Sequence, residues 1–189
     1  MEYRILGRTG LRVSAVALGC EGFMEKSAGE VRADLDFAID RGINFIDIYS
    51  PNPQLRENIG AALEGRRGNF IIQGHLCTVW EEDQYLRTRD PEKTRASFET
   101  QLQQLRTDYL DIGMIHYIDA EEDFRRVFDG EILRYARRLR SEGRSGRGTR
   151  LCTGLAGAGT LHLAGTLHVL RTLRPLHSRN RHRCGEQVL

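Results

Sequence analysis

Residues 109–117 read YLDIGMIHY, a short apolar run bounded by polar residues. The run is too brief for a helix and is typical of a buried strand. The strand would end at His116, where the chain is expected to enter a loop. Because α/β proteins place reactive side chains at the carboxyl ends of parallel strands, His116 is a candidate site residue. A core histidine bonded to the backbone is the alternative.

Four apolar runs of this kind alternate with helical patterns along the first 140 residues. The predicted strands are residues 15–19, 43–47, 69–73 and 109–116. Each is followed by a helix whose apolar residues recur at i, i+4 and i+7. The helix before the last strand is expected to start at Asp90-Pro91, and residues 81–89 form a polar excursion ahead of it. The last helix is expected to continue through Gly130 to Leu139 without a break.

The alternation of strand and helix predicts an α/β fold with parallel strands and helices packed outside. Residues 3–13 come first and are expected to form a small hairpin closed by a glycine-containing turn. The strands are too apolar to have one face in water. Units of this kind build an open doubly wound sheet or a (βα)8 barrel. No GxGxxG motif follows the first strand, which argues against the dinucleotide-binding open sheet.

The composition is that of an ordinary globular protein up to about residue 140 and then changes. No run approaches the roughly 20 apolar residues of a membrane span, and the N-terminus has no signal-peptide core, so we expect a cytoplasmic protein with reduced cysteines. Residues 141–189 hold 8 Arg, no Lys and only two Glu, and all fourteen aromatic residues precede them. We therefore predict a folded domain over residues 1–143 and a tail over 144–189 that is out of frame or poorly ordered.

Four functional hypotheses concern the tail: a phosphate loop, nucleic-acid binding, a metal site and an amphipathic partner-binding helix. The metal site would use His162, His168, His177, His182 and Cys184, but their spacing fits no known finger. The helix would carry Leu163, Leu167, Leu170 and Leu173 at helical spacing. The glycine-rich residues 154–160 invite a phosphate loop, but no convincing strand precedes them and no Gly-Lys-Ser/Thr follows. The Arg/Gly stretch over residues 144–150 suits electrostatic binding of nucleic acid, but it lacks any aromatic side chain for base stacking. A frameshift near residues 143–145 is the simpler hypothesis.

The predicted strand ends bring reactive side chains to one edge of the sheet. These side chains are Cys20, Asp47, His75, Cys77 and His116. A carboxylate and two histidines suit general acid–base chemistry. Together with a cysteine they also suit zinc or iron, so a metal-binding half-barrel is an alternative.

Four segments, in chain order, resemble the aldo-keto reductases. They are YRILGRTGLRVS at 3–14, RGINFID at 41–47, NIGAAL at 58–63 and TDYLDI at 107–112. The resemblance covers residues 1 to about 140 and implies a (βα)8 TIM barrel, truncated to about its first four βα units after the hairpin. It also implies NADPH-dependent reduction of a small-molecule carbonyl substrate.

The family's catalytic tetrad is aspartate, tyrosine, lysine and histidine, and the resemblance retains two of the four. The aspartate maps onto Asp47 and the histidine onto His116. The tyrosine position falls on Asn52, and Tyr49 is the nearest phenol, at a different offset. His75 stands where the family has its lysine. Because the tyrosine donates the proton and the lysine lowers its pKa, carbonyl reduction is expected to be impaired.

The remaining resemblance concerns cofactors and partners. Residues 73–80, QGHLCTVW, resemble a divergent bacterial branch whose longer members carry an iron–sulfur segment, but no such cysteine cluster occurs in this chain. The family's NADPH-binding residues lie on later strands, and none of their motifs is present. Four units would leave open strand edges, which favour self-association. The sequence therefore leaves two readings: an aldo-keto reductase with Asp47, His75, His116 and Tyr49 at its site, or a catalytically inactive fragment acting as an interaction module.

Overall fold

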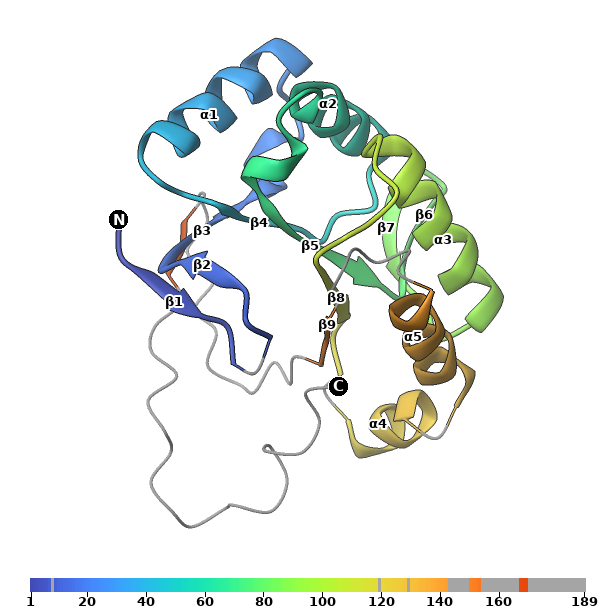
Figure 1. Cartoon of the computed structure of the whole chain (residues 1–189). Coiled ribbons are helices and arrows are strands. Elements are labelled where there is room, and N and C mark those ends of the chain that lie inside the picture. The colour runs from blue at the N-terminus through green and yellow to red at the C-terminus, as the bar shows by residue number, and fades with distance from the viewer. Residues whose placement is uncertain (8, 119, 129, 143–149, 154–166, 170–189) are drawn as a thin grey trace.

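The computed structural model describes residues 1–7, 9–118, 120–128, 130–142, 150–153 and 167–169 (Figure 1). The frameshift hypothesis and the glycine-rich residues 154–160 lie outside this described part. Its helices include none long and apolar enough to cross a membrane.

A six-stranded sheet in the order β10-β3-β4-β5-β8-β9 forms the centre of the molecule. Five of its strands run parallel in chain order, and β10 pairs antiparallel to β3. The strands are β3 (Val16–Gly19), β4 (Phe45–Ile48), β5 (Ile71–Leu76), β8 (Ile112–Ile115), β9 (Arg150–Thr153) and β10 (Leu167–Val169). The predicted parallel α/β fold is confirmed, with β9 as a fifth parallel strand.

The helices form an arc outside the curved sheet, as Figure 1 shows. They are α1 (Ala28–Asp40), α2 (Pro53–Leu63), α3 (Pro91–Gln104), α4 (Glu121–Phe128) and α5 (Glu131–Ser141), with short 3₁₀ turns η1 (Cys20–Phe23) and η2 (Arg67–Asn69). The predicted start of α3 is confirmed, because the Asp90 side chain accepts hydrogen bonds from the backbone N–H groups of Glu92 and Lys93. The four predicted βα units are therefore present.

The prediction of one continuous helix through Gly130 is wrong. The helix ends at Phe128, and Gly130 is the extended N-cap of α5. A Cβ at Gly130 would lie 2.2 Å from the carbonyl oxygen of Arg126, so only glycine fits where one helix ends and the next begins. The apolar period continued across the break because both helices turn an apolar face to the same core.

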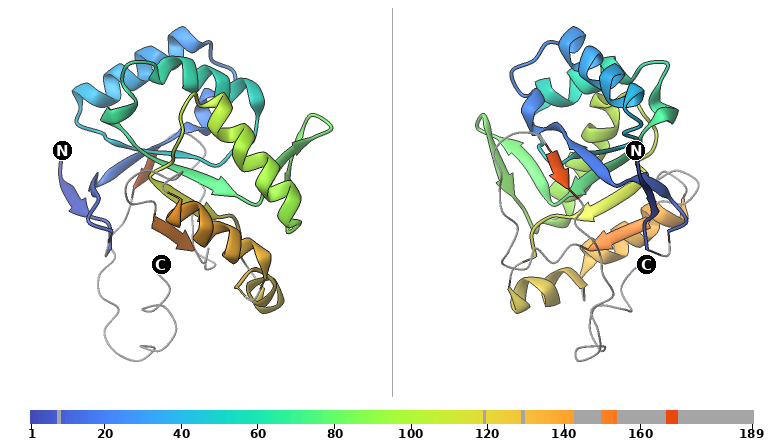
Figure 2. Two further views of the ribbon diagram at one scale, coloured as in Figure 1. Left: turned by 45° about the vertical axis from the view of Figure 1, so that its right-hand side comes forward. Right: turned by 90° about the vertical axis from the view of Figure 1, so that its left-hand side faces the viewer.

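The polar excursion predicted at residues 81–89 is largely a second hairpin. It consists of β6 (Thr78–Glu81) and β7 (Gln84–Arg87), and it extends from the end of β5 beside α3 (Figure 2). The two turn residues, Glu82 and Asp83, both have positive φ, 50° and 56°, as a tight type I′ turn requires. Neither residue is glycine or asparagine, so the usual sequence signal for this turn is absent.

The sheet has two different faces. Alternate strand residues such as Ile46, Ile48 and Ile72 point outward and form the main core with the helices. On the other face, the hairpin of β1 (Tyr3–Ile5) and β2 (Arg12–Ser14) covers the amino ends of the strands. There Val13 packs in one cluster with Phe45. The hairpin thus closes one end of the inner face and leaves the carboxyl end for polar side chains.

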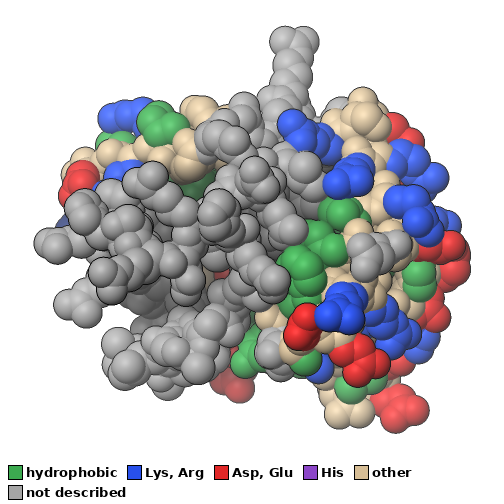
Figure 3. All heavy atoms as spheres, turned by 90° about the horizontal axis from the view of Figure 1, so that it is seen from below, with side chains coloured by type: hydrophobic (Ala, Val, Ile, Leu, Met, Phe, Trp, Pro, Cys, Tyr) green, Lys and Arg blue, Asp and Glu red, His purple; other side chains and the backbone are tan. Residues whose placement is uncertain are grey.

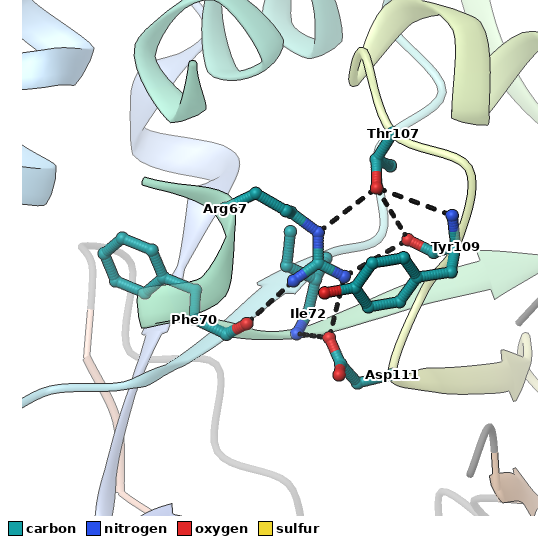
Figure 4. A network of polar contacts seen from close by, with 6 residues as sticks. All are labelled: Arg67, Phe70, Ile72, Thr107, Tyr109 and Asp111. Carbon is teal, nitrogen blue, oxygen red and sulfur yellow. Dashed lines mark hydrogen bonds and ion pairs between the residues drawn. The ribbon is translucent and has the colours of Figure 1, made fainter. Parts of the chain in front are cut away.

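A polar network joins the amino ends of β5 and β8 (Figure 4). The Arg67 guanidinium donates to Asp111 at 2.8 Å and to the carbonyl oxygens of Phe70 and Tyr109 at 2.8 and 3.1 Å. It also lies 4.0 Å from the centre of the Tyr109 ring. Asp111 in turn accepts from the backbone N–H of Ile72 at 2.9 Å. This network fixes the register of the two strands that carry the histidines.

The edges of the four predicted strands are not open as expected. β9 pairs with β8 and β10 pairs with β3, so the outer edges of the described sheet belong to these two short strands. Chain segments after residue 149 take these positions, although their composition predicts no strand.

The face seen from below mixes charges of both signs around a small group of hydrophobic side chains (Figure 3). Ion pairs along α4 and α5 join Arg125 with Glu121, Arg134 with Glu131, and Arg138 with Glu142, the residue after α5. On the described part of this face, acidic side chains thus accompany the basic ones.

Candidate active site

Strand alternation brings the polar candidates to the inner face of the half-barrel. Side chains two residues apart on a strand share a face, so Asp47 lies on the same side of β4 as Phe45, which belongs to the inner cluster. The pairing of Asp47 with Gln73 and of His75 with Met114 carries this face across to β8. His116 follows β8 at the same parity. The site is therefore the polar, carboxyl-end half of a surface whose other half is apolar.

Asp47, His75 and His116 form one hydrogen-bonded chain. Nε2 of His75 lies 3.0 Å from Oδ1 of Asp47, and Nδ1 of His75 lies 2.8 Å from Nδ1 of His116. Gln73 donates to the same oxygen of Asp47 at 2.8 Å. The side chains of His75 and Asp47 are only 9% and 20% exposed. The prediction that these three residues converge is thus met by direct contact.

One arrangement of the ring protons satisfies these hydrogen bonds with both imidazoles neutral. An ionised carboxylate only accepts, so Nε2 of His75 carries a proton toward Asp47. Nδ1 of His75 is then an acceptor, and Nδ1 of His116 donates to it. Nε2 of His116 is left with its lone pair and has no hydrogen-bond partner among the described residues. The hydrogen-bonded chain from Asp47 through His75 to His116 therefore ends in a basic nitrogen, Nε2 of His116.

Burial keeps His116 neutral. It lowers the pKa of His116 from 6.5 to about 4, and the neighbouring His75 and Arg89 act in the same direction. The ring of Tyr49 stacks on His116 at 5.9 Å with an interplanar angle of 8°, and Tyr85 meets it edge-on at 5.7 Å. The aromatic rings therefore supply an apolar surrounding in which a neutral imidazole is favoured.

Tyr49 belongs to the site by its ring and not by its hydroxyl. The hydroxyl donates to Oε1 of Glu21 at 2.6 Å. Burial raises the pKa of Tyr49, and the hydrogen bond to Glu21 raises it further. A phenol that donates protons in catalysis needs the opposite influence, a neighbouring cation that lowers its pKa. The sequence did not reveal this pairing, because Glu21 precedes Tyr49 by 28 residues.

The two cysteines at the strand ends are buried thiols. Burial raises the pKa of Cys20, and Asp47 raises it further. Burial also raises the pKa of Cys77, whose sulfur accepts from the Thr94 hydroxyl at 3.8 Å. Within the described residues, no three His, Cys, Asp or Glu side chains are grouped to hold a metal ion. The metal hypothesis therefore has no geometric support in this part of the chain.

Arg89 anchors the strand end that carries His116, a role the sequence did not suggest. Its guanidinium donates twice to Asp123, at 2.6 Å each, and to the carbonyl oxygens of His116 and Tyr117 at 2.9 and 2.6 Å. The hydrogen bonds from Arg89 also lower the pKa of Asp123. Arg89 thus fixes the backbone on which His116 is carried and adds a positive charge near its ring.

Comparison with known proteins gives consistent matches. The family model described as "Aldo/keto reductase family" matches residues 15–146. The chain is 32% identical over 149 residues to the uncharacterized oxidoreductase YrpG of Bacillus subtilis, covering 68% of this chain and 44% of that protein. It is 30% identical over 132 residues to the aldo-keto reductase YhdN of the same organism, covering 63% and 39%. The chain thus spans less than half the length of these relatives.

Solved structures show the same fold. A putative aldo-keto reductase from Pseudomonas aeruginosa, PA4992, matches with a TM-score of 0.70 and 26% identity over 80% of this chain and 59% of that one. The holo form of AKR11C1 from Bacillus halodurans matches with a TM-score of 0.65 and 23% identity, covering 81% and 50%. The predicted TIM-barrel type of α/β fold is therefore confirmed.

Proposed function

The chain belongs to the aldo/keto reductase family, and on that premise we propose that its inner-face site performs the proton-transfer half of carbonyl–alcohol interconversion. The substrate class is a small-molecule carbonyl compound or its alcohol. The observation that carries this proposal is the hydrogen-bonded chain from Asp47 through His75 to His116. It places a neutral base at the carboxyl ends of the strands, where barrel enzymes hold their substrates.

Nε2 of His116 takes the hydroxyl proton of a bound alcohol and leaves an alkoxide, with no change of oxidation state. The proton on Nδ1 of His116 passes to Nδ1 of His75, which becomes an imidazolium. The Asp47 carboxylate, already bonded to Nε2 of His75, stabilises that charge. In the reverse direction the same two protons move back, and His116 protonates the alkoxide oxygen. One proton is transferred in either direction, and none is lost from the relay.

We further propose that carbonyl reduction by this chain is impaired relative to the family. Tyr49 is bound to Glu21 with a raised pKa, so it is a poor proton donor. His75 occupies the position that the family resemblance gives to lysine. A relay ending in a histidine with a pKa of about 4 holds a proton poorly at neutral pH, which favours the base form.

The described residues do not fit the whole of NADPH, the nucleotide that this family generally uses. The rings of Tyr49 and Tyr85 and the amide of Gln73 suit a flat, polar ring. Phosphate groups need cations, and the two arginines at this end are engaged: Arg89 with Asp123 and backbone carbonyls, and Arg87 with the carbonyl oxygen of Tyr117. The relay therefore accounts for the proton alone, and the hydride that separates an alcohol from its carbonyl compound has no donor or acceptor among the described residues.

Two measurements test the proposal. The first is ¹⁵N NMR of the histidine rings at pH 7, where we expect a proton on Nδ1 of His116 and on Nε2 of His75. A proton on Nε2 of His116 instead would contradict the relay. The second is titration of NADPH fluorescence with the full chain, where we expect no saturation in the micromolar range. Two results together would refute the proposal of impaired carbonyl reduction. They are saturable micromolar binding of NADPH and carbonyl reduction that is abolished in His116→Gln, and they would identify the chain as an active reductase.

A second candidate function is an interaction module that self-associates through the sheet. The observation favouring it is that the sheet ends in β10 and β9, strands of three and four residues that have no outer neighbour among the described residues. A barrel of this type closes on itself and leaves no edge. Light scattering after size exclusion, over a range of concentrations, is expected to show dimers or larger species. A monomer at every concentration would refute self-association as the function of this chain.

A further inference from the structure

A cavity lies between α2, β6 and α3, outside the inner-face site. Its volume is about 250 Å³, and it is bordered by the loop before α2, by α2 itself, by β6 and by α3. The lining residues that matter here are Pro51, Arg56, Val79, Trp80, Lys93 and Gln104. Asp47, His75 and His116 do not line it, so it is distinct from the relay.

Arg56 is the unusual residue of this cavity. It is only 1% exposed, and its Nε donates to the carbonyl oxygen of Ser50 at 2.9 Å. Nη2 has no hydrogen-bond partner among the residues that the structure describes. Burial lowers the pKa of Arg56 to about 9. A buried guanidinium with one neutral acceptor is costly, because charge removed from water needs a counter-charge.

The other walls of the cavity are mixed in a way that suggests an amphipathic ligand. Val79 and Pro51 are buried apolar residues, and the Trp80 ring is half-buried. Oε1 of Gln104 is a second buried polar atom without a partner among the described residues. Lys93 and Glu81 also line the cavity and bind each other at 2.7 Å, so their charges cancel. The net charge of the lining is therefore that of Arg56.

We propose that this cavity binds a small carboxylate with an apolar, ring-sized body. The carboxylate binds at the Arg56 guanidinium and neutralises its charge. The body of the ligand packs between Trp80 and the apolar wall. A cavity of about 250 Å³ lies just below the range of roughly 300–1,000 Å³ for drug-sized ligands, which limits the ligand to about one ring.

Trp80 allows a direct test, because it is the chain's one tryptophan. Benzoate is titrated into the full chain while tryptophan fluorescence is recorded, with benzyl alcohol as the neutral counterpart and inorganic phosphate as an anion without an apolar body. We expect saturable quenching by benzoate and binding at least about tenfold weaker for the other two, since a hydrogen bond to a charged group contributes about a factor of ten or more. Equal affinity for benzoate and benzyl alcohol, or for benzoate and phosphate, would overturn the proposal.

Variants separate the cavity from non-specific binding. Arg56→Met removes the guanidinium but keeps an unbranched apolar stem, and we expect it to weaken benzoate binding about tenfold or more. Arg66→Met is the matched control, because Arg66 pairs with Asp36 and does not line the cavity; its affinity for benzoate should be unchanged. Ala96→Phe fills the cavity from α3 without touching the charge and should abolish binding even if Arg56→Met does not fold. Unchanged benzoate affinity in a folded Arg56→Met or Ala96→Phe chain would refute the site.

Discussion

The amino and carboxyl ends of strands β5 and β8 use charged and polar groups in opposite ways. At the amino end, Arg67 and Asp111 are partly buried, at 16% and 19% exposure, and bond to each other and to the backbone around them. At the carboxyl end, His116 is as buried but is held neutral, and one of its ring nitrogens has no partner among the described residues. A satisfied network stabilises the fold, whereas an incomplete one costs stability and leaves a group ready to react.

The amino end should therefore show the largest effect on stability. Arg67→Met removes the guanidinium and leaves Asp111 and two backbone carbonyls without their donor. We expect a loss of about 3 kcal/mol in the free energy of unfolding, because breaking one half of a largely buried ion pair strands its partner. Urea denaturation at pH 7 measures it. The double variant Arg67→Met/Asp111→Asn is the control and should be more stable than the single variant.

Much of this contrast was predictable from the sequence, because strand periodicity and strand ends are local signals. The helix start at Asp90-Pro91 and the placement of Asp47, His75 and His116 at one edge both follow from such signals. The unpredicted features depend on contacts between distant residues or on backbone geometry. Glu21 reaches Tyr49 only in the folded chain, and the turn at Glu82–Asp83 adopts positive φ without a glycine.

At the carboxyl end, the buried neutral His116 should make the free energy of unfolding depend on pH. The pKa of His116 is 6.5 in the unfolded chain and about 4 in the folded one. Between these values the unfolded state binds the extra proton, so the contribution of His116 to stability is fully present above pH 6.5 and is lost as the pH falls toward 4. We expect a loss of about 2 kcal/mol after allowing for solvent screening.

The measurement is urea denaturation at a series of pH values from 7 to 4. The variant His116→Gln cannot take up the proton and should lose less stability over the same range than the wild-type chain. Groups away from the site are the same in both proteins, so the difference between the two curves reports His116 together with the residues bonded to it. Parallel curves would show that His116 is not held neutral by its surroundings, and the contrast between the two ends would then disappear.

The smallest change in the free energy of unfolding should come from Tyr49→Phe. This variant tests whether Tyr49 acts at the carboxyl end through its ring or through its hydroxyl. Tyr49→Phe keeps the ring that stacks on His116 and removes only the hydroxyl bonded to Glu21, an exposed residue. We expect a change of less than about 1 kcal/mol in the free energy of unfolding. The ¹⁵N signals of His116 should keep their pH dependence, because the apolar surrounding is retained. Tyr49→Ala removes the ring, exposes the imidazole to water and should raise the pKa of His116 toward 6.5. If Tyr49→Phe raised the pKa of His116 as much as Tyr49→Ala does, the hydroxyl and not the ring would set that pKa. Tyr49 would then be a candidate for direct participation in proton transfer.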